Sequence, residues 1–526
     1  MVLSVRITKL WCSQRSLFAN SHRFCVKLAF SSLSKSQVFY SINEDCDDDF
    51  LPWLERKSGV EISSVLSIAK SVHGRSLVAS DKIRSGDCVL KVPYNVQIAP
   101  DNLLPEIRSL LGDEIGNVAK VATVLLFEQK INKDSEWAPY INRLPQLGQM
   151  HNTIFWSEDE LDMVHESSLY QETINKNIQI EQDFLAIKRA LEPILEVDHI
   201  TLKDFMHAYA LVLKGYLRIY KLLNRKYMRR KLGFGVKLTS CKMVLWIILI
   251  QQNLLLTTAG TMQVESRAWG STKGVSLIPF ADFLNHDAVS EAVVLNDDEK
   301  QLSEVFADRD YVPGEEVLIR YGKFSNATLL SDFGFTLLYN RHDEVKIHIN
   351  ISDHDTLREM KLELLQRYRL PCIEDVNGFN SSRDSFTIKE IKSATGKGKG
   401  LPQSLRAFAR VLCCSTLQEL CDLVTEAAQN DGRLARRPFR NSRQEIQAHQ
   451  ILLSEITQLI EEYNASIESL ECVVSPPTCK RFALRKKMAR DLLVGELRVL
   501  ESASAWLKNY CSTLTSTLIF SDNLSD

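Results

Sequence analysis

The sequence predicts an α+β fold: a mostly β domain with a helical insert, followed by an all-helical domain. Three observations support this prediction. Short apolar runs separated by turn residues, which are typical of strands, occupy residues 73–93 and return from Val275 to about Ile351. Between these regions, residues 115–130 carry apolar side chains at helical spacing. Beyond Ile351, long stretches place their apolar residues on one helical face, which predicts helices.

Length and composition limit the number of domains and the classes of partner. The chain has 526 residues, of which 45% are hydrophobic, so two or three domains are expected rather than one. The net charge of −2 gives no general basicity that would indicate a nucleic-acid partner. The twelve cysteines include no Cys-x-x-Cys pair, so we expect no zinc site and no other metal.

The N-terminal region has the composition of a targeting segment. The first 43 residues contain no Asp or Glu but several Arg, Lys and Ser residues, and acidic residues return abruptly at Glu44. This composition is typical of an organelle transit peptide, which we place at residues 1–45. We predict the chloroplast as the compartment, with the mitochondrion as the alternative because transit compositions overlap. A disordered basic tail also fits the composition.

The next elements are predicted from local patterns. Residues 50–70 suit one or two short helices, and residues 158–225 are mostly helical in character. Two apolar runs, 77–79 and 88–93, are joined through Ser85-Gly86-Asp87 and together predict a small β unit.

A segment at about 213–262 differs from both of its flanks. No acidic residue lies between Asp204 and Glu265, whereas Lys and Arg are frequent. Its apolar run, 243–250, is far too short to span a membrane, so we predict no membrane span. One hypothesis is a basic segment that binds a membrane surface or RNA. The other is that these residues come from a retained intron or an incorrect gene prediction.

Three segments stand out through their order along the chain. They are His73-Gly74-Arg75, the stretch from Arg267 to His286, and the stretch from Gly314 to Tyr321 with Asp332-Phe333-Gly334-Phe335 after it. In this order they resemble SET-domain protein lysine methyltransferases of the plant Rubisco large-subunit methyltransferase-like family. The helices at about 404–506 resemble that family's C-terminal substrate-binding domain. The resemblance covers nearly everything after residue 50.

The resemblance implies S-adenosyl-L-methionine as the cofactor and assigns residues to it. The backbone of His73, Gly74 and Arg75 would lie along the cofactor, where glycine permits a close approach. Arg267 would meet the carboxylate of the cofactor, because a guanidinium fork suits a carboxylate. Asn285 and His286 would hold its adenine and amino-acid ends.

The resemblance also assigns the methyl-acceptor side. Tyr321 would be the catalytic residue, at the mouth of a methyl-transfer channel, and Asp282 would line the substrate side. Trp269, Phe333 and Phe335 would supply apolar walls. Such walls disfavour the ammonium form of lysine and thus lower a side-chain pKa that is ordinarily about 10.4. The family usually has Tyr where this chain has Phe333, and we hypothesise that Phe333 favours multiple methylation.

The domain bounds and partners follow from the same resemblance. We expect a SET domain at 50–340, with a helical insert at about 115–265, and a helical substrate-binding domain at 345–526. A protein substrate would bind between the two domains, with no nucleic acid, and the oligomeric state is not predicted. The predicted function is methyl transfer from S-adenosyl-L-methionine to a lysine amine of a non-histone organelle protein. The alternative is a catalytically inactive SET-like binding or scaffold protein in a plastid complex.

Overall fold

The computed structural model describes residues 49–71, 74–112, 114–192, 200–214, 275–368, 370, 385–429, 432–472 and 480–522. The predicted transit peptide and the basic segment from residue 215 onward lie outside these residues. So do three of the predicted site residues, His73, Arg267 and Trp269.

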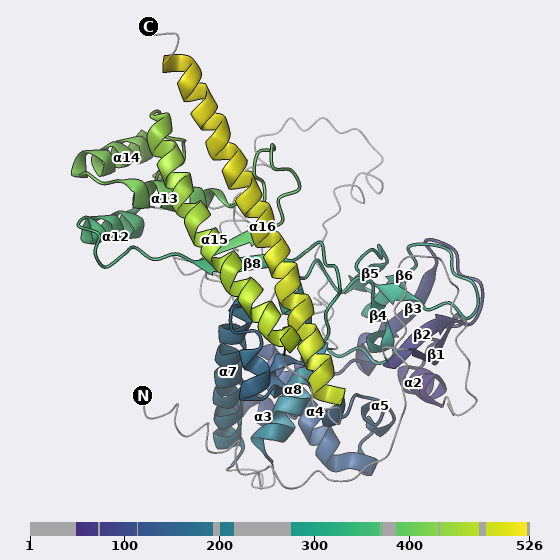
Figure 1. Cartoon of the computed structure of the whole chain (residues 1–526). Helices are drawn as coiled ribbons and strands as arrows, with labels where there is room; N and C mark the ends of the chain where they lie inside the picture. Colours follow the sequence, from purple (N-terminus) through teal and green to yellow (C-terminus); the bar gives the residue numbers. More distant parts are fainter. Residues whose placement is uncertain are drawn as a thin grey trace, which may run out of the picture. The chain divides into compact units, whose positions relative to one another are not determined.

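The strands of the described residues are short and form four small sheets (Figure 1). In the first two sheets, β1 (Leu66–Ser71) pairs antiparallel with β2 (Gly74–Ala79), and β6 (Leu302–Phe306) lies between β3 (Cys88–Pro93) and β5 (Val293–Asp297). In the other two, β4 (Asn285–His286) pairs in parallel with β7 (Leu318–Ile319), and β8 (Glu344–His348) pairs antiparallel with β9 (Ser385–Lys389).

Two local predictions are wrong about the first strands. β2 and β3 do not form one unit, because β2 pairs with β1 and β3 pairs with β6, more than 200 residues away in sequence. Residues 66–70 belong to strand β1, whereas the local pattern suggested a helix. In both cases the structure depends on which strand pairs with which, and the local pattern of one segment does not show its pairing partner.

The helical insert packs against the first strands as one core. Its helices are α3 (Pro105–Leu110), α4 (Asn117–Ile131), α5 (Ala138–Ile141), α6 (Glu158–Asp162), α7 (Ser168–Leu191) and α8 (Leu202–Lys214), and α2 (Phe50–Ser58) precedes them. The predicted helix at 115–130 is confirmed as α4, whose residues 118–119 and 121–126 are buried. Ser157 begins α6 with a capping box, since its hydroxyl accepts from Glu160 N and the Glu160 carboxylate accepts from Ser157 N.

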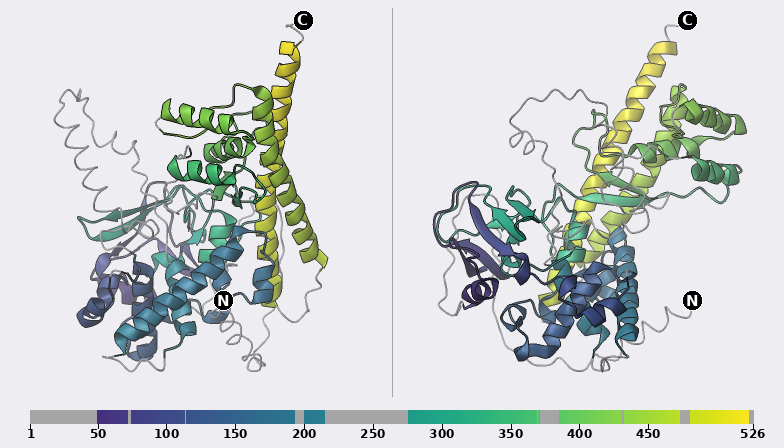
Figure 2. Two further views of the ribbon diagram at one scale, coloured as in Figure 1. Left: turned by 90° about the vertical axis from the view of Figure 1, so that its left-hand side faces the viewer. Right: turned by 180° about the vertical axis from the view of Figure 1, so that it is seen from behind.

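The C-terminal region is mostly helical. It contains α12 (Arg358–Arg367), α13 (Gln403–Cys413), α14 (Leu417–Gln429), α15 (Ser442–Cys472) and α16 (Lys480–Asp522), and the short α11 (Asn326–Thr328) lies before it. Helices α15 and α16 lie side by side and run in opposite directions, as all views show (Figures 1 and 2). The α+β fold class, with a helical second domain, is confirmed, but that domain is not all-helical, because it also contains the antiparallel pair of β8 and β9.

Two hydrophobic cores meet at the helical insert. The first core contains residues of β1, β2, β3, β6 and β7 together with α4 and α8, and it extends to Phe333. Residues of β8 and β9 belong to the second core. The second contains α13, α15 and α16, and it also takes in Trp156, Val164 and Leu169 from the insert. The two cores are therefore joined by packing as well as by the chain.

A buried carboxyl group links the insert to the second core. Glu496 on α16 is 2% exposed, and its two oxygens accept hydrogen bonds from Ser167 Oγ and Tyr463 OH, each at 3.0 Å. Burial raises the pKa of Glu496 to about 8, although both hydrogen bonds oppose the rise. A carboxyl whose pKa is higher in the folded chain stabilises the fold below about pH 4, and this contribution is lost as the pH rises toward 8.

We therefore expect Glu496→Gln to stabilise the protein at alkaline pH. The amide keeps an acceptor oxygen but does not ionise, so the variant lacks the loss of stability between about pH 4 and pH 8. The gain at pH 8.5 is on the order of a few kcal/mol, and it falls toward zero near pH 4. Thermal unfolding at both pH values measures it, with the exposed Glu461→Gln as the control. A gain that is equal at both pH values would contradict the assignment.

Candidate active site

Tyr321 lies where two strands from distant parts of the sequence meet. The parallel pairing of β4 with β7 places Asn285 beside Leu318 and His286 beside Ile319. Two residues after β7, the backbone N–H of Tyr321 donates to His286 Nδ1 at 3.1 Å. The Tyr321 hydroxyl donates to the carbonyl oxygen of Leu284 at 2.8 Å, so both ends of the tyrosine are held by the β4 segment.

Aromatic rings surround Tyr321. Its ring centroid lies 5.0 Å from that of Phe333, 5.1 Å from that of His286 and 6.5 Å from that of Phe335. Phe333 in turn stacks on Phe324 at 5.8 Å. Tyr321 and Phe333 are only 9% and 5% exposed, so the hydroxyl lies in apolar surroundings.

The surroundings fix the protonation states of Tyr321 and His286. Burial, followed by the charges of Asp282 and Glu316, raises the pKa of Tyr321 above its ordinary value of 10, so the hydroxyl stays protonated near neutral pH. Burial, together with the charges of Arg320 and His342, lowers the pKa of His286 to about 4. His286 is therefore neutral, and because its Nδ1 accepts from Tyr321 N, its proton lies on Nε2.

Asp282 lies in a short 3-10 helix, Ala281–Phe283, just before β4. Its Oδ2 accepts from Tyr140 OH at 2.5 Å and from Ile278 N at 3.1 Å. Its Oδ1 is buried and has no hydrogen-bond partner among the described residues. Burial raises the pKa of Asp282 to about 8, although both hydrogen bonds oppose the rise. Asp282 is thus part of the contact between the strands and the insert, and its carboxyl is mostly protonated near neutral pH.

The residues predicted to contact the cofactor lie at the start of β2 and on β4. Gly74 has φ +107° and is exposed, and open space lies where a Cβ would stand, so a ligand can approach its backbone closely. Asn285 Nδ2 donates to Arg75 O at 3.3 Å and to Glu316 Oε1 at 2.8 Å. The Asn285 side chain therefore joins β4 to β2 and to Glu316, two residues before β7, and does not point freely toward a ligand.

The structure brings together Gly74, Arg75, Asn285, His286, Tyr321 and Phe333, and Asp282 acts on Tyr321 through its charge once it ionises, at about pH 8 and above. The sequence analysis included Glu316 only within the stretch from Gly314 to Tyr321, without a role of its own, and it missed Phe324, Asn152 and Lys176. Glu316 and Phe324 stand within a few residues of Tyr321 and could have been suspected. Asn152 and Lys176 are more than 140 residues from Tyr321, and no sequence pattern marks them.

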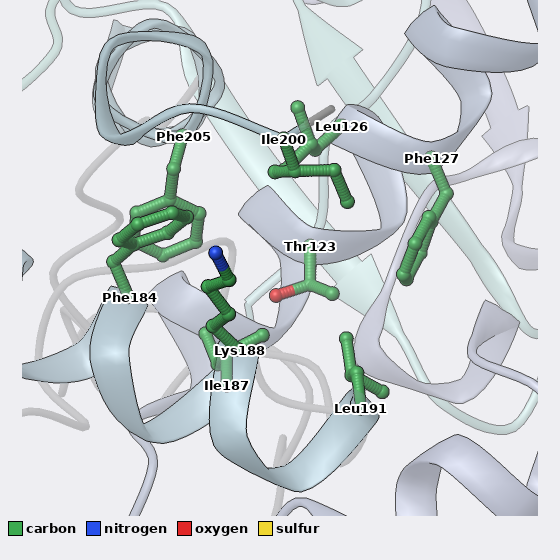
Figure 3. Close-up of a pocket in the computed structure, with 9 residues that line it drawn as sticks. All are labelled: Thr123, Leu126, Phe127, Phe184, Ile187, Lys188, Leu191, Ile200 and Phe205. Atoms are coloured by element: carbon green, nitrogen blue, oxygen red, sulfur yellow. The ribbon is translucent and has the colours of Figure 1, made fainter. Parts of the chain in front are cut away.

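The described cavities lie away from these residues. Figure 3 shows a small apolar cavity between α4, α7 and α8, lined by residues such as Thr123, Phe184 and Phe205. Its volume of about 10 Å³ is roughly that of one water molecule. A larger polar hollow of about 230 Å³ is lined by Gln129, His207 and their neighbours. No predicted site residue lines either cavity.

The described residues contain neither a candidate metal site nor a helix that could span a membrane. No group of three or more His, Cys, Asp or Glu side chains lies close enough there to hold a metal ion. None of the helices described has a run of apolar residues sufficient to cross a membrane.

Two protein families match this chain. The SET domain family matches residues 74–322, and the Rubisco LSMT substrate-binding family matches residues 352–500. Among curated proteins, the chain is similar to actin-histidine N-methyltransferases. The protein from Dasypus novemcinctus is 25% identical over 481 residues, which cover 89% of this chain and 70% of that protein. The protein from Danio rerio is 26% identical over 485 residues, which cover 89% and 69%.

Solved structures of Rubisco LSMT share this fold. The structure bound to sinefungin and monomethyllysine matches with a TM-score of 0.61 and 20% identity, over 88% of this chain and 92% of that chain. The LSMT SET domain bound to lysine and AdoHcy matches with a TM-score of 0.60 and 20% identity, over 88% and 91%.

Proposed function

Because this chain belongs to the SET-domain proteins that carry a Rubisco LSMT substrate-binding domain, we propose that it is an S-adenosyl-L-methionine-dependent protein methyltransferase whose acceptor is a lysine side chain. One observation carries the proposal: the Tyr321 hydroxyl is kept protonated among aromatic rings, beside two strands that hold the predicted cofactor residues. Solved relatives of this fold bind AdoMet, AdoHcy and lysine.

The residues present fit S-adenosyl-L-methionine. The rings of Tyr321 and Phe333 and the charge of Glu316 that acts on Tyr321 suit a sulfonium cation, because an aromatic face and a negative charge both attract a cation. Open space at Gly74 leaves its backbone accessible to a flat ligand group. When bound, the cofactor supplies an electrophilic methyl group. Gly74, Arg75, Asn285 and His286 would hold it, the last two through their backbone and through His286 Nε2.

The chain's own groups orient the acceptor. Since the pKa of Tyr321 is raised, the hydroxyl is a hydrogen-bonding group and not the base that removes the proton of the amine. A lysine amine, with an ordinary pKa of about 10.4, must become neutral before it can attack. The buried rings of Tyr321 and Phe333 disfavour the ammonium form and thereby favour the neutral amine. Correct alignment of donor and acceptor then contributes most of the rate.

Histidine is the second candidate acceptor, and the curated relatives support it because they are actin-histidine N-methyltransferases. The two acceptors differ in their proton requirement. An imidazole, with a pKa of about 6.5, is already mostly neutral at pH 7.5, whereas a lysine amine is not.

We expect the rate of methyl transfer to keep rising up to about pH 9, because an amine acceptor loses its proton only there. Initial rates with [methyl-³H]S-adenosyl-L-methionine and the full chain measure this profile on peptide arrays that contain either lysine or histidine. Mass spectrometry then identifies the modified side chain. A rate that levels off above about pH 7, with label on histidine, would replace lysine with histidine as the acceptor.

The number of methyl groups transferred should depend on Phe333. A hydroxyl at this position would lie beside Tyr321, 5.0 Å away between ring centroids, and could hold a water molecule or restrain the amine. We therefore expect Phe333→Tyr to shift the products from di- and trimethyllysine toward monomethyllysine by several-fold. Product ratios from mass spectrometry test this, with Phe386→Tyr in the second core as the control. An unchanged ratio would refute the role of Phe333.

The proposed compartment is the chloroplast, because the first 43 residues lack acidic residues and are rich in Ser, Lys and Arg. A fluorescent protein fused to residues 1–60 tests this by microscopy, and signal in mitochondria would select the alternative. A non-catalytic scaffold protein is the remaining alternative. It would be supported if calorimetry and the label assay found neither cofactor binding nor transfer.

A further inference from the structure

A buried asparagine from the helical insert holds the backbone that carries Phe333. Asn152 is 1% exposed, and its Nδ2 donates to the carbonyl oxygens of Ser331 at 3.1 Å and Asp332 at 2.7 Å. These carbonyls belong to the π-helix Leu329–Phe333. The last carbonyls of a helix lack partners within the helix, so the amide of Asn152 replaces those partners.

Two further contacts fix the same turn. Gly334 ends the π-helix with φ +76°, and a Cβ there would stand only 3.0 Å from Asn152 N, so the two backbones touch. From α7, Lys176 Nζ contacts Asp332 Oδ1 at 2.5 Å and Ser331 Oγ at 2.8 Å. Residues 331–334 are therefore held by contacts from both the loop of Asn152 and α7.

The loop that carries Asn152 is itself held by the C-terminal domain. Arg485 on α16 is 1% exposed and donates to Met150 O at 3.1 Å and to Phe155 O at 3.0 Å, on either side of Asn152. Its charge is balanced by Glu160 Oε2 at 2.6 Å. A guanidinium fork reaches all three acceptors at once, which an ammonium does not.

We propose that Asn152 is a positioning residue for methyl transfer, which holds the Phe333 ring against Tyr321, and that Arg485 makes this contact depend on the C-terminal domain. The substrate-binding domain thus supports the geometry of the active site in addition to binding the substrate. The inference rests on the proposed function in one respect, namely that the Tyr321 site is where the methyl group is transferred.

The first consequence concerns the rate. Without the Asn152 amide, the carbonyls of Ser331 and Asp332 lose their donor, and the turn that bears Phe333 is free to shift. A displacement of about 1 Å at a reacting centre costs up to roughly 100-fold in rate. The predicted cofactor residues Asn285 and His286 are held by other contacts, so cofactor affinity does not depend on Asn152.

The kinetic test compares Asn152→Ala and Gly334→Ala with the wild-type full chain. The added Cβ of Gly334→Ala disturbs the same contact from the other side. We expect kcat to fall roughly 10- to 100-fold in both variants, while the calorimetric Kd for S-adenosyl-L-methionine stays within about twofold. Arg485→Lys should lower kcat in the same way but less. Ile456→Val, a core variant in α15, controls for loss of stability and should keep the wild-type kcat.

A spectroscopic test does not depend on activity. Position 333 is labelled with 4-fluorophenylalanine and observed by ¹⁹F NMR in the wild type, in Asn152→Ala, in Gly334→Ala and in Ile456→Val. We expect the resonance to shift or broaden in the first two variants and to match the wild type in the third. An unchanged resonance in both Asn152→Ala and Gly334→Ala overturns the inference, whatever the activity. A displaced resonance in a chain that transfers no methyl group supports the contact and instead overturns the proposed function.

Discussion

Tyr321→Phe is expected to lower the rate of methyl transfer by about 100-fold or more, because removal of one correctly placed hydrogen-bonding group at a reacting centre has effects of this size. The substitution keeps the ring and its contacts with Phe333 and His286, which lie 5.0 Å and 5.1 Å away between centroids. It removes only the hydroxyl, whose hydrogen bond to Leu284 O fixes its direction. The expected change is therefore in kcat, with cofactor affinity unchanged.

The measurement needs a control that loses a similar hydroxyl elsewhere. Tyr94 is also buried, and its hydroxyl donates to Asp298 Oδ1 at 2.9 Å, outside the candidate site. Tyr94→Phe should keep the wild-type rate. Initial rates and calorimetric cofactor binding on the three proteins separate catalysis from folding. If Tyr321→Phe kept the rate within twofold, Tyr321 would not be the catalytic residue.

Arg410→Met is expected to destabilise the protein by about 3–5 kcal/mol, because it leaves a buried carboxylate without its cation. Arg410 and Glu445 are 3% and 2% exposed and are joined by two hydrogen bonds of 2.9 and 2.7 Å. Burial alone would raise the pKa of Glu445, but the hydrogen bonds and charge of Arg410 outweigh it and hold the pKa below its usual value. Arg410 also donates to Ala435 O at 3.0 Å, which would lose that donor.

Urea denaturation measures this loss, and two further variants interpret it. Arg410→Met combined with Glu445→Leu removes both charges and should recover most of the stability, because the penalty comes from the unpaired charge. Arg490→Met breaks an exposed ion pair, in which the side chains of Arg490 and Glu471 are 46% and 56% exposed. It should lower the free energy of unfolding by less than about 1 kcal/mol. Equal losses for Arg410→Met and Arg490→Met would contradict the role of burial.

The parts of the fold that the sequence predicted are those with a local cause. The apolar spacing of residues 115–130 is enough to predict α4, and its buried face follows. The resemblance to a known family predicted that Asn285, His286, Tyr321 and Phe333 belong to one site. The structure places them next to one another. Their roles in binding and catalysis remain predictions.

The parts that escaped prediction depend on contacts between distant residues. Asn152 binds backbone carbonyls 179 and 180 residues away, and Arg485 binds carbonyls 335 and 330 residues away. A carbonyl oxygen is present in every residue, so a side chain that binds one leaves no complementary residue type in the sequence. For the same reason, nothing in the sequence around Asn152 indicates that its side chain contributes to the site.

The hydrogen bonds from Arg485 on α16 to the loop around Asn152 have a consequence for the synthesis of the protein. Chains leave the ribosome from the N-terminus and fold domain by domain in that order. All of the described candidate-site residues lie before residue 336, but Arg485 is made only near the end of the chain. Until α16 has emerged, the carbonyls of Met150 and Phe155 lack their donor, and the loop that carries Asn152 lacks this contact. If Arg485 has the proposed role, a truncated chain that lacks α16 contains the candidate-site sequence but is expected to transfer methyl groups more slowly than the full chain.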